Sequence, residues 1–495
     1  MSLSRHTSYN LIGSVLPIGL SLITVPIYLK LVGSERYGVL AIAWLLLGYF
    51  GLFDLGLGRA TSFRIASLRN ATPQQQADAF WSAIAVNIGM GLVGGLVLWI
   101  AASYFFGHFL KVDEHLRPEM LAAAPLLALG VPEATAIGVL TGALQGRERF
   151  LQTNVNSVLS TALFQFLPLL VAWKFGPNLV WLLSAALLAR ALGALSLFWR
   201  CWQELVRGQK IAPHRSEIMT LLTYGGWVNV ASIFGPILYM VDRFAIGALL
   251  GATAVTSYTV PVQLSSRMAI LPGALITALF PRLSGASPDE RRELSERAML
   301  TLGGLLTVPF IGAIFVIGPF LQLWVGQRVG PEAPMIGRYM TAAMFANALA
   351  LVSFTRLQAS GRPDLVTKIL LIEIPPYLIL LYLGIHFLGM TGAALAASAR
   401  YVADFLLLTW MAGPPERGRG LIGFIFVLML LSVWFAGLWS FTDWRWWLSG
   451  GSMVSIGALA GFVVIPIQIR QQLITRGRGW FGIAPAIALA RPDRE

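Results

Sequence analysis

The sequence has almost no cysteine and very little charge. Cys201 is the single cysteine among 495 residues, so the chain can form no intramolecular disulfide and no cysteine cluster for zinc. The five histidines are scattered without metal-ligand spacing. Charged residues make up 12% of the chain, whereas soluble domains carry about 25%. A disulfide-stabilised domain, a zinc protein and an ordinary soluble domain are therefore excluded.

Catalytic motifs are also missing. The sequence shows no Ser-His-Asp arrangement, no Walker-type Gly-Lys loop and no acidic metal motif. We therefore predict that the chain is not an enzyme, binds no cofactor and does not hydrolyse ATP by itself. A membrane-embedded polysaccharide polymerase or glycosyltransferase remains an alternative, but it usually needs a sizeable outer loop, and the predicted outer loops are all short.

Long apolar runs dominate what is present, because 56% of the residues are hydrophobic. A helix needs about 20 apolar residues to cross a bilayer. That criterion predicts an all-α polytopic membrane protein with about fourteen transmembrane helices embedded in a lipid bilayer. The predicted spans lie near residues 9–32, 37–57, 79–106, 119–144, 153–173, 179–199, 219–246, 253–280, 298–325, 335–355, 367–387, 390–411, 421–440 and 446–468.

Basic residues are distributed unevenly between the two sides. If the N-terminus is cytoplasmic, the inner segments hold 24 of the 36 lysines and arginines, and the outer loops hold seven. Basic residues concentrate on the cytoplasmic side of membrane proteins. We therefore predict that both termini are cytoplasmic. This asymmetry accounts for most of the formal charge of +13, so no nucleic-acid partner is needed to explain it.

The chain also repeats itself weakly. Gly33 after the first span matches Gly251 after the seventh, and Arg190 in the sixth span aligns with Arg400 in the twelfth. Six spans return the chain to its starting side, so these matches predict two six-helix halves related by a pseudo-two-fold axis along the membrane normal. The predicted units are 1–210 for the first half, 211–415 for the second, and 416–495 for two additional helices and a cytoplasmic tail.

Arg267 is the sharpest candidate among the charged residues inside spans. It lies midway along the eighth span, five residues before Pro272. A charge at the bilayer centre costs roughly 2.5–3.5 kcal/mol on insertion scales. A guanidinium binds phosphate oxygens in a bidentate manner, which favours an anion site. A structural pair with a carboxylate or with backbone carbonyls is the alternative.

Charges near the ends of spans have two interpretations each. Asp242 and Arg243 form a gate or bind a coupling ion, or else make a local structural pair. Asp54 lies close to the inner end of the second span and belongs to the same gate or ion-coupling group. Arg59 and Arg64 lie at the predicted cytoplasmic mouth, where they either attract an anionic headgroup or simply follow the positive-inside rule.

Further charges lie within spans. Arg190 and Arg400 are candidate substrate contacts. Asp404 lies one helical turn from Arg400, so a structural ion pair between these two residues is the favoured interpretation. Glu133 and Glu373 lie next to prolines. Each is a candidate carrier of H⁺ or Na⁺.

Several stretches together resemble the oligosaccharide and polysaccharide (O-antigen-type) flippase family of the multidrug/oligosaccharidyl-lipid/polysaccharide exporter superfamily. The resemblance covers at least the first twelve spans. It rests on VPIYLKLVGSERYGVLA, FDLGLGRA, DRFAIGALLGATAVTSYTVP and SSRMAILPGALITALFPRLS.

The resemblance implies a bacterial inner-membrane flippase that works by alternating access. It would move a polyprenyl-diphosphate-linked oligosaccharide from the cytoplasmic to the periplasmic leaflet, with a polysaccharide polymerase and a chain-length regulator as further partners. By the same resemblance Arg267 contacts the diphosphate or an adjacent sugar acid, and Arg59 and Arg64 are inner-mouth cations. The driving force would be H⁺, Na⁺ or the membrane potential.

Other functions remain open. Lipid II flippases carry an arginine in the first span, but this sequence has none between Tyr9 and Leu29. That departure favours an O-antigen or exopolysaccharide repeat unit over lipid II. A cation-coupled multidrug antiporter would line its cavity with carboxylates, whereas deep arginines are prominent here. A structural partner in a polysaccharide assembly complex is a third alternative.

Overall fold

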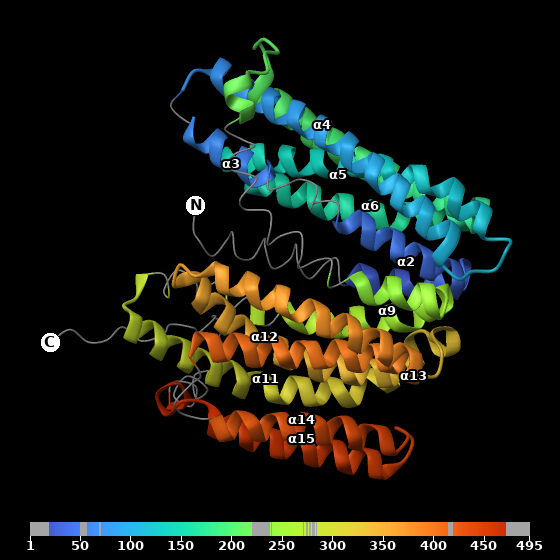
Figure 1. Ribbon diagram of the computed structural model, residues 1–495, viewed down its shortest axis with the longest axis vertical. Coiled ribbons are helices and arrows are strands. Elements are labelled where there is room, and N and C mark those ends of the chain that lie inside the picture. The colour runs from blue at the N-terminus through green and yellow to red at the C-terminus, as the bar shows by residue number, and fades with distance from the viewer. Residues whose placement is uncertain are drawn as a thin grey trace, which may run out of the picture. The chain divides into compact units, whose positions relative to one another are not determined.

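The computed structural model describes residues 19–49, 57–68, 71–219, 240–270, 285–413 and 419–471, together with single positions between 238 and 283. Every regular element in these residues is a helix. A short apolar helix at Gly19–Leu31 comes first. It is followed by α2 (Ser34–Tyr49), α3 (Leu57–Ser67), α4 (Pro73–Tyr104), α5 (Arg117–Gly146), α6 (Phe150–Phe175), α7 (Leu179–Cys201), α9 (Ala252–Ser266), α11 (Pro288–Trp324), α12 (Ala333–Ala359), α13 (Pro363–Ala412), α14 (Arg419–Leu438) and α15 (Trp444–Val464) (Figure 1).

The helices agree with the predicted spans. Among the described residues, nine helices are long and apolar enough to cross a membrane. Each of the fourteen predicted spans overlaps helical residues. Large apolar side chains such as Leu92, Leu96 and Ile100 on α4 are exposed, which is the surface that a lipid-facing helix presents. The prediction of an all-helical polytopic membrane protein is confirmed.

Helix boundaries follow from local chemistry. Thr72 caps α4 with a full capping box, in which its hydroxyl accepts from the amide of Gln75 and the Gln75 side chain accepts from the amide of Thr72. Asn178 caps α7 and Asp443 caps α15 in the same general way. These caps satisfy amides that would otherwise lack partners at the helix ends.

A sharp reversal divides α13 into two spans. Gly389 has φ 58° and ψ −139°, a conformation that glycine adopts because it has no Cβ. The reversal brings Gly384 and Gly392 so close that a Cβ on either one would overlap the backbone of the other. The sequence placed this boundary between 387 and 390, and the structure confirms it.

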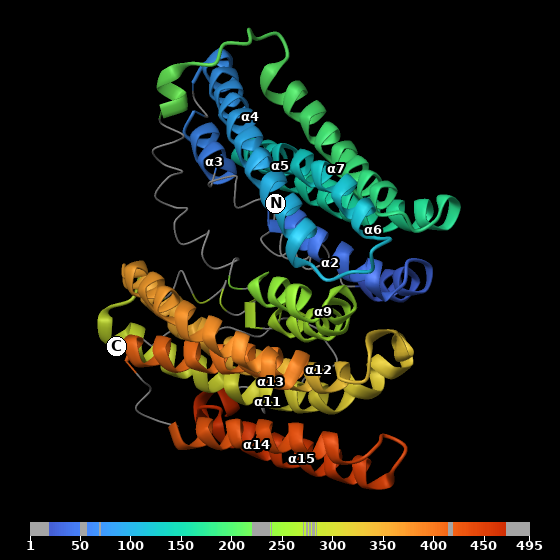
Figure 2. The ribbon, with the colours of Figure 1, turned by 45° about the vertical axis from the view of Figure 1, so that its right-hand side comes forward.

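The first compact unit comprises Met1–Arg267, Ile317–Ala343 and Thr367–Asp404. Within it α5 packs against α3, α4 and α7, and α6 packs against α7 (Figure 2). A buried apolar cluster joins α3, α4, α5 and α7, and includes Phe80, Leu144 and Cys201. These four helices therefore share a buried apolar core.

Helices α2 and α9 of this unit begin in the same way and contact each other. Gly33 (φ 82°) and Gly251 (φ 97°) precede them with positive φ. The Thr256 hydroxyl donates to the Ser34 carbonyl over 2.5 Å, and a Cβ on Gly38 would overlap the backbone carbonyl of Ala252. The matched glycines seen in the sequence thus mark two equivalent helix starts, as an internal repeat requires.

The second compact unit comprises Met268–Val316, Met344–Val366 and Phe405–Glu495. In it α14 packs along α15, and α15 also packs on α11. The backbones of Gly304 and Gly461 approach so closely that a Cβ on either would lie 2.5 Å from the other's carbonyl oxygen. The Phe315 and Trp446 rings meet edge-on at 5.6 Å. The predicted boundaries at 210 and 415 stay a prediction.

Candidate functional site

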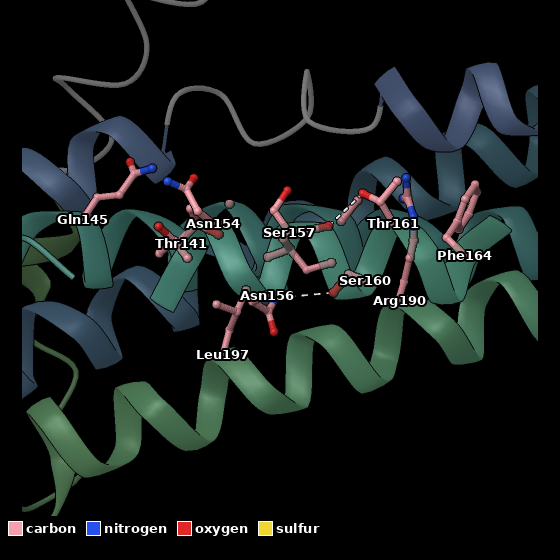
Figure 3. A pocket seen from close by; sticks show the side chains of 14 residues that line it. Thr141, Gln145, Asn154, Asn156, Ser157, Ser160, Thr161, Phe164, Arg190 and Leu197 are labelled. Atoms are coloured by element: carbon pink, nitrogen blue, oxygen red, sulfur yellow. Dashed lines mark hydrogen bonds between the residues drawn. The ribbon is translucent and has the colours of Figure 1, made fainter. Parts of the chain in front are cut away.

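A cavity of about 490 Å³ lies among α5, α6 and α7 (Figure 3), within the size range of ligand pockets. Eight of its fourteen described lining residues are polar but uncharged, although all three helices are apolar overall. The polar lining residues are Thr141, Gln145, Thr153, Asn154, Asn156, Ser157, Ser160 and Thr161, together with Arg190.

One face of α6 supplies most of this polar lining. Asn154, Ser157 and Thr161 recur at helical spacing and point along the cavity (Figure 3). The Asn156 amide donates to the Ser160 hydroxyl over 3.3 Å, and the Thr161 hydroxyl donates to the Ser157 carbonyl over 2.7 Å. The sequence analysis did not single out these residues. Their three- and four-residue spacing inside an apolar span was the signal that could have found them.

Arg190 projects from the middle of α7 toward the Thr161–Phe164 part of the cavity (Figure 3). Its guanidinium carbon lies 5.1 Å from the centre of the Phe164 ring, a cation–π distance. Glu133 of α5 is half-buried and interacts electrostatically with Arg190. Two residues that the sequence nominated separately are therefore neighbours.

A second group of charges lies near the start of α9. Asp242 and Arg243 are both buried, and Nη1 of Arg243 lies 2.9 Å from Oδ1 of Asp242. The Tyr258 hydroxyl donates to Oδ2 of Asp242 over 2.7 Å. The Arg243 guanidinium also lies 5.8 Å from the Tyr258 ring centre. Asp242 is thus held from two sides, by a neighbouring cation and by a hydroxyl from another helix.

Arg400 lies in a comparable buried setting on α13. Its guanidinium carbon is 5.4 Å from the Tyr377 ring centre and 4.5 Å from that of Tyr401. Glu373 is buried, and neither of its carboxyl oxygens has a hydrogen-bond partner among the described residues. Glu373 interacts electrostatically with Asp404 and Arg400.

Tyr377 joins the two groups, because it interacts electrostatically with Asp242, Arg243 and Arg400. We call the combined set the charge cluster; its members are Asp242, Arg243, Tyr258, Glu373, Tyr377, Arg400, Tyr401 and Asp404. It contains two arginines and three acids. The sequence nominated most of these residues as separate candidates, and the structure brings them together within the first unit.

Arg267 ends α9 and begins a single 3₁₀ turn, Arg267–Ala269. The helix thus changes its winding at Arg267, five residues before Pro272. Arg267 is exposed to a small pocket that Ser21, Gln263 and Trp324 also line. Within the described part of the chain it has no ion-pair partner.

Of the candidates at the predicted cytoplasmic mouth, the structure describes the side chain of Arg64 but not those of Arg59 and Asp54. Arg64 makes a two-point ion pair with Glu217, at 2.7 Å and 2.5 Å, and this hydrogen bonding raises the pKa of the guanidinium. Arg59 lies on α3, but its side chain is outside the described part of the chain, and so is Asp54. Arg64 therefore has a protein carboxylate as its partner.

Comparison with known proteins supplies the family. Residues 3–287, more than half of the chain, match the family described as "Polysaccharide biosynthesis protein". A relative from Shigella flexneri, named "Putative O-antigen transporter", is 26% identical over 414 residues, which cover 83% of this chain and 98% of the relative.

Two solved structures share the fold. "Lipid II flippase MurJ, inward closed conformation" has a TM-score of 0.70 at 15% identity and covers 96% of this chain and 99% of its own. An inward-facing multidrug resistance MATE family transporter of the MOP superfamily has a TM-score of 0.65 at 14% identity and covers 83% of this chain and 98% of its own. At these identities the likeness concerns the fold alone. The apolar spans, the fold and the family match agree, and the chain belongs to the polysaccharide biosynthesis protein family as a multi-pass membrane transporter rather than an enzyme.

Proposed function

We propose that the protein is a flippase for polyprenyl-diphosphate-linked oligosaccharides, the repeat units of an O-antigen or exopolysaccharide. It moves them from the cytoplasmic to the periplasmic leaflet of a bacterial inner membrane by alternating access. The observation that carries the proposal is the cavity among α5, α6 and α7, whose lining residues in the described part of the chain include eight neutral polar residues and an arginine but no carboxylate.

The substrate explains why such a cavity is needed. A polyprenyl chain can remain in lipid, but a hydroxyl that leaves water without a new hydrogen bond costs roughly 2–7 kcal/mol. An oligosaccharide carries many hydroxyls, so it crosses only where the protein replaces the hydrogen bonds that water made. Asn, Gln, Ser and Thr side chains supply both donors and acceptors.

The arginines serve the charged part of the substrate in this proposal. Arg267 contacts the diphosphate, since its guanidinium has no described carboxylate partner and its side chain lines a small pocket beside Ser21 and Gln263. Arg190 contacts the headgroup within the cavity. Arg59 and Arg64 attract the diphosphate at the cytoplasmic mouth, where Arg64 would exchange Glu217 for the substrate. Arg400 acts within the charge cluster.

The charge cluster supplies ion coupling in the same proposal. Three acids face two arginines there, so one proton or one Na⁺ would balance the charge. Glu373 is the acid that lacks hydrogen-bond partners. We infer that ion binding at this cluster, or the membrane potential, drives the change of access. A polysaccharide polymerase and a chain-length regulator would receive the product.

A cation-coupled multidrug antiporter is supported less well. Its substrates are cations, and a cavity that attracts cations needs acidic side chains. Glu133 interacts with Arg190 but is not among the described residues that line the cavity. The likeness to multidrug and lipid II transporters therefore describes shared architecture.

Reconstitution into liposomes tests the proposal. The protein is inserted with a polyprenyl-diphosphate-linked oligosaccharide, and a membrane-impermeant probe measures the fraction in each leaflet. We expect Arg267→Ala to slow flipping about tenfold or more, because a hydrogen bond to a charged group contributes about 1.5–3 kcal/mol. Arg267→Lys keeps the charge and should retain part of the rate.

Arg297→Ala is the matched control, since Arg297 pairs with Glu293 on an exposed surface. It should leave flipping unchanged. Normal flipping by a correctly inserted Arg267→Ala protein would remove Arg267 from the site. Export of organic cations without movement of the lipid-linked oligosaccharide would overturn the function itself.

A further inference from the structure

We propose that the cavity among α5, α6 and α7 is a subsite for an acidic sugar residue of the oligosaccharide, whose carboxylate or phosphate group is bound by Arg190. The inference rests on the proposed function and adds a substrate class to it. The transported repeat unit would be an anionic one.

The cavity has two chemically different parts. Gln145, Asn154 and Ser157 form a neutral part, and Arg190 with Phe164 forms a cationic part (Figure 3). Along α6 the lining extends over about 16 Å, given a rise of about 1.5 Å per residue. A short oligosaccharide can therefore place neutral sugars against amides and hydroxyls while an acidic sugar reaches the arginine.

The setting of Arg190 suits an oxyanion. The Arg190 guanidinium carbon lies 5.1 Å from the centre of the Phe164 ring and makes a cation–π contact with it. A guanidinium presents its N–H donors in its plane, where they match two oxygens of a carboxylate or phosphate. The Phe164 ring thus helps to hold the guanidinium beside the cavity.

Glu133 supplies a counter-charge in the structure. It comes from α5, interacts electrostatically with Arg190 and lies half-buried. A charge inside the membrane is expensive unless an opposite charge compensates it. An acidic sugar can take over this compensation from Glu133, whereas a neutral sugar cannot. The cavity should therefore discriminate between acidic and neutral repeat units.

The test uses two lipid-linked oligosaccharides that share the polyprenyl diphosphate and differ in one residue, a hexuronic acid or the corresponding hexose. Flipping of both is measured in the same proteoliposomes. We expect the wild-type chain to flip the acidic substrate at least tenfold faster at limiting substrate. Arg190→Gln should abolish this preference by slowing the acidic substrate alone.

Two further variants make the result specific. Glu133→Gln removes the competing carboxylate and should lower the KM for the acidic substrate several-fold while leaving the neutral one unchanged. The double variant Glu133→Gln/Arg190→Gln removes both charges together, so it inserts without an uncompensated ion and should show no preference. Lys174→Gln changes an exposed cation at the far end of α6 and is the control.

The outcomes separate this inference from the proposed function. Equal flipping of both substrates by the wild-type chain would overturn the acidic-sugar subsite and leave the flippase standing. An equal loss for both substrates in Arg190→Gln would mean that Arg190 binds the shared diphosphate, which also overturns the inference. Failure to flip either substrate would overturn the proposed function.

Discussion

Asp242 compensates the positive charge of Arg243, which would otherwise be costly to bury inside the membrane. Arg243 is buried beside it, and the Tyr258 hydroxyl completes the coordination of the carboxylate. The two groups contribute differently to stability, because the Asp242 carboxylate balances a charge, whereas the Tyr258 hydroxyl contributes one hydrogen bond. Removing each part should therefore have a different effect on stability.

We expect Asp242→Asn to destabilise the protein by about 3–5 kcal/mol, because it removes the carboxylate that pairs directly with the buried Arg243 guanidinium. Tyr258→Phe should cost only about 1 kcal/mol, which is typical of a hydrogen bond between membrane helices. Thermal unfolding in detergent, followed by the loss of the monodisperse fraction, measures both changes.

Glu293→Gln provides the control, since its ion pair with Arg297 lies on an exposed surface and pairs of that kind contribute little. If Asp242→Asn melted at the wild-type temperature, Arg243 would have another source of compensation. The ion pair would then not be the structural requirement that its burial indicates.

The helices could be predicted from the sequence, but the side-chain contacts between them could not. Hydropathy is a local property, so it predicted the helical spans and the boundary between residues 387 and 390 inside α13. The polar face of α6 is also encoded by a local pattern, but the high mean hydropathy of that span concealed it. The meeting of Asp242 with Tyr377 depends on the packing of distant segments, and no local pattern encodes it.

The contact between α11 and α15 shows how small residues fix helix packing. Gly457 and Gly461 on α15 are four residues apart, which is the small-xxx-small pattern of close membrane helices. Gly457 faces Ile311, and Gly461 faces Gly304 at backbone distance. Close glycine packing therefore fits α15 against α11.

Gly461→Ala should destabilise the second unit by about 1–3 kcal/mol, because the new methyl group overlaps the Gly304 carbonyl and the helices must separate. Gly451→Ala on the same helix is the matched control, since nothing lies within 4 Å of its Cβ position. Thermal unfolding of the two purified variants gives the comparison. A Gly461→Ala protein as stable as Gly451→Ala would show that α15 shifts without cost.

For the whole molecule, the distribution of charge decides the orientation in the membrane. The inner segments are predicted to hold most of the 36 basic residues, and moving such segments across the membrane is disfavoured. A flippase that collects its substrate on the cytoplasmic side must also open its cavity there. The α5–α6 connection, next to Gln145 and Asn154, lies on the predicted cytoplasmic side.

The single cysteine makes this orientation directly measurable. Cys201 is fully buried, so the wild-type chain should not react with a membrane-impermeant maleimide and serves as the blank. His115 and Lys210 are exposed in connections on opposite predicted sides. In right-side-out vesicles His115→Cys should label and Lys210→Cys should not, and in inside-out vesicles the pattern should reverse. The opposite pattern would mean that the whole chain is inverted, with both termini outside. The α5–α6 end of the cavity would then lie on the periplasmic face, where no lipid-linked precursor is available for uptake.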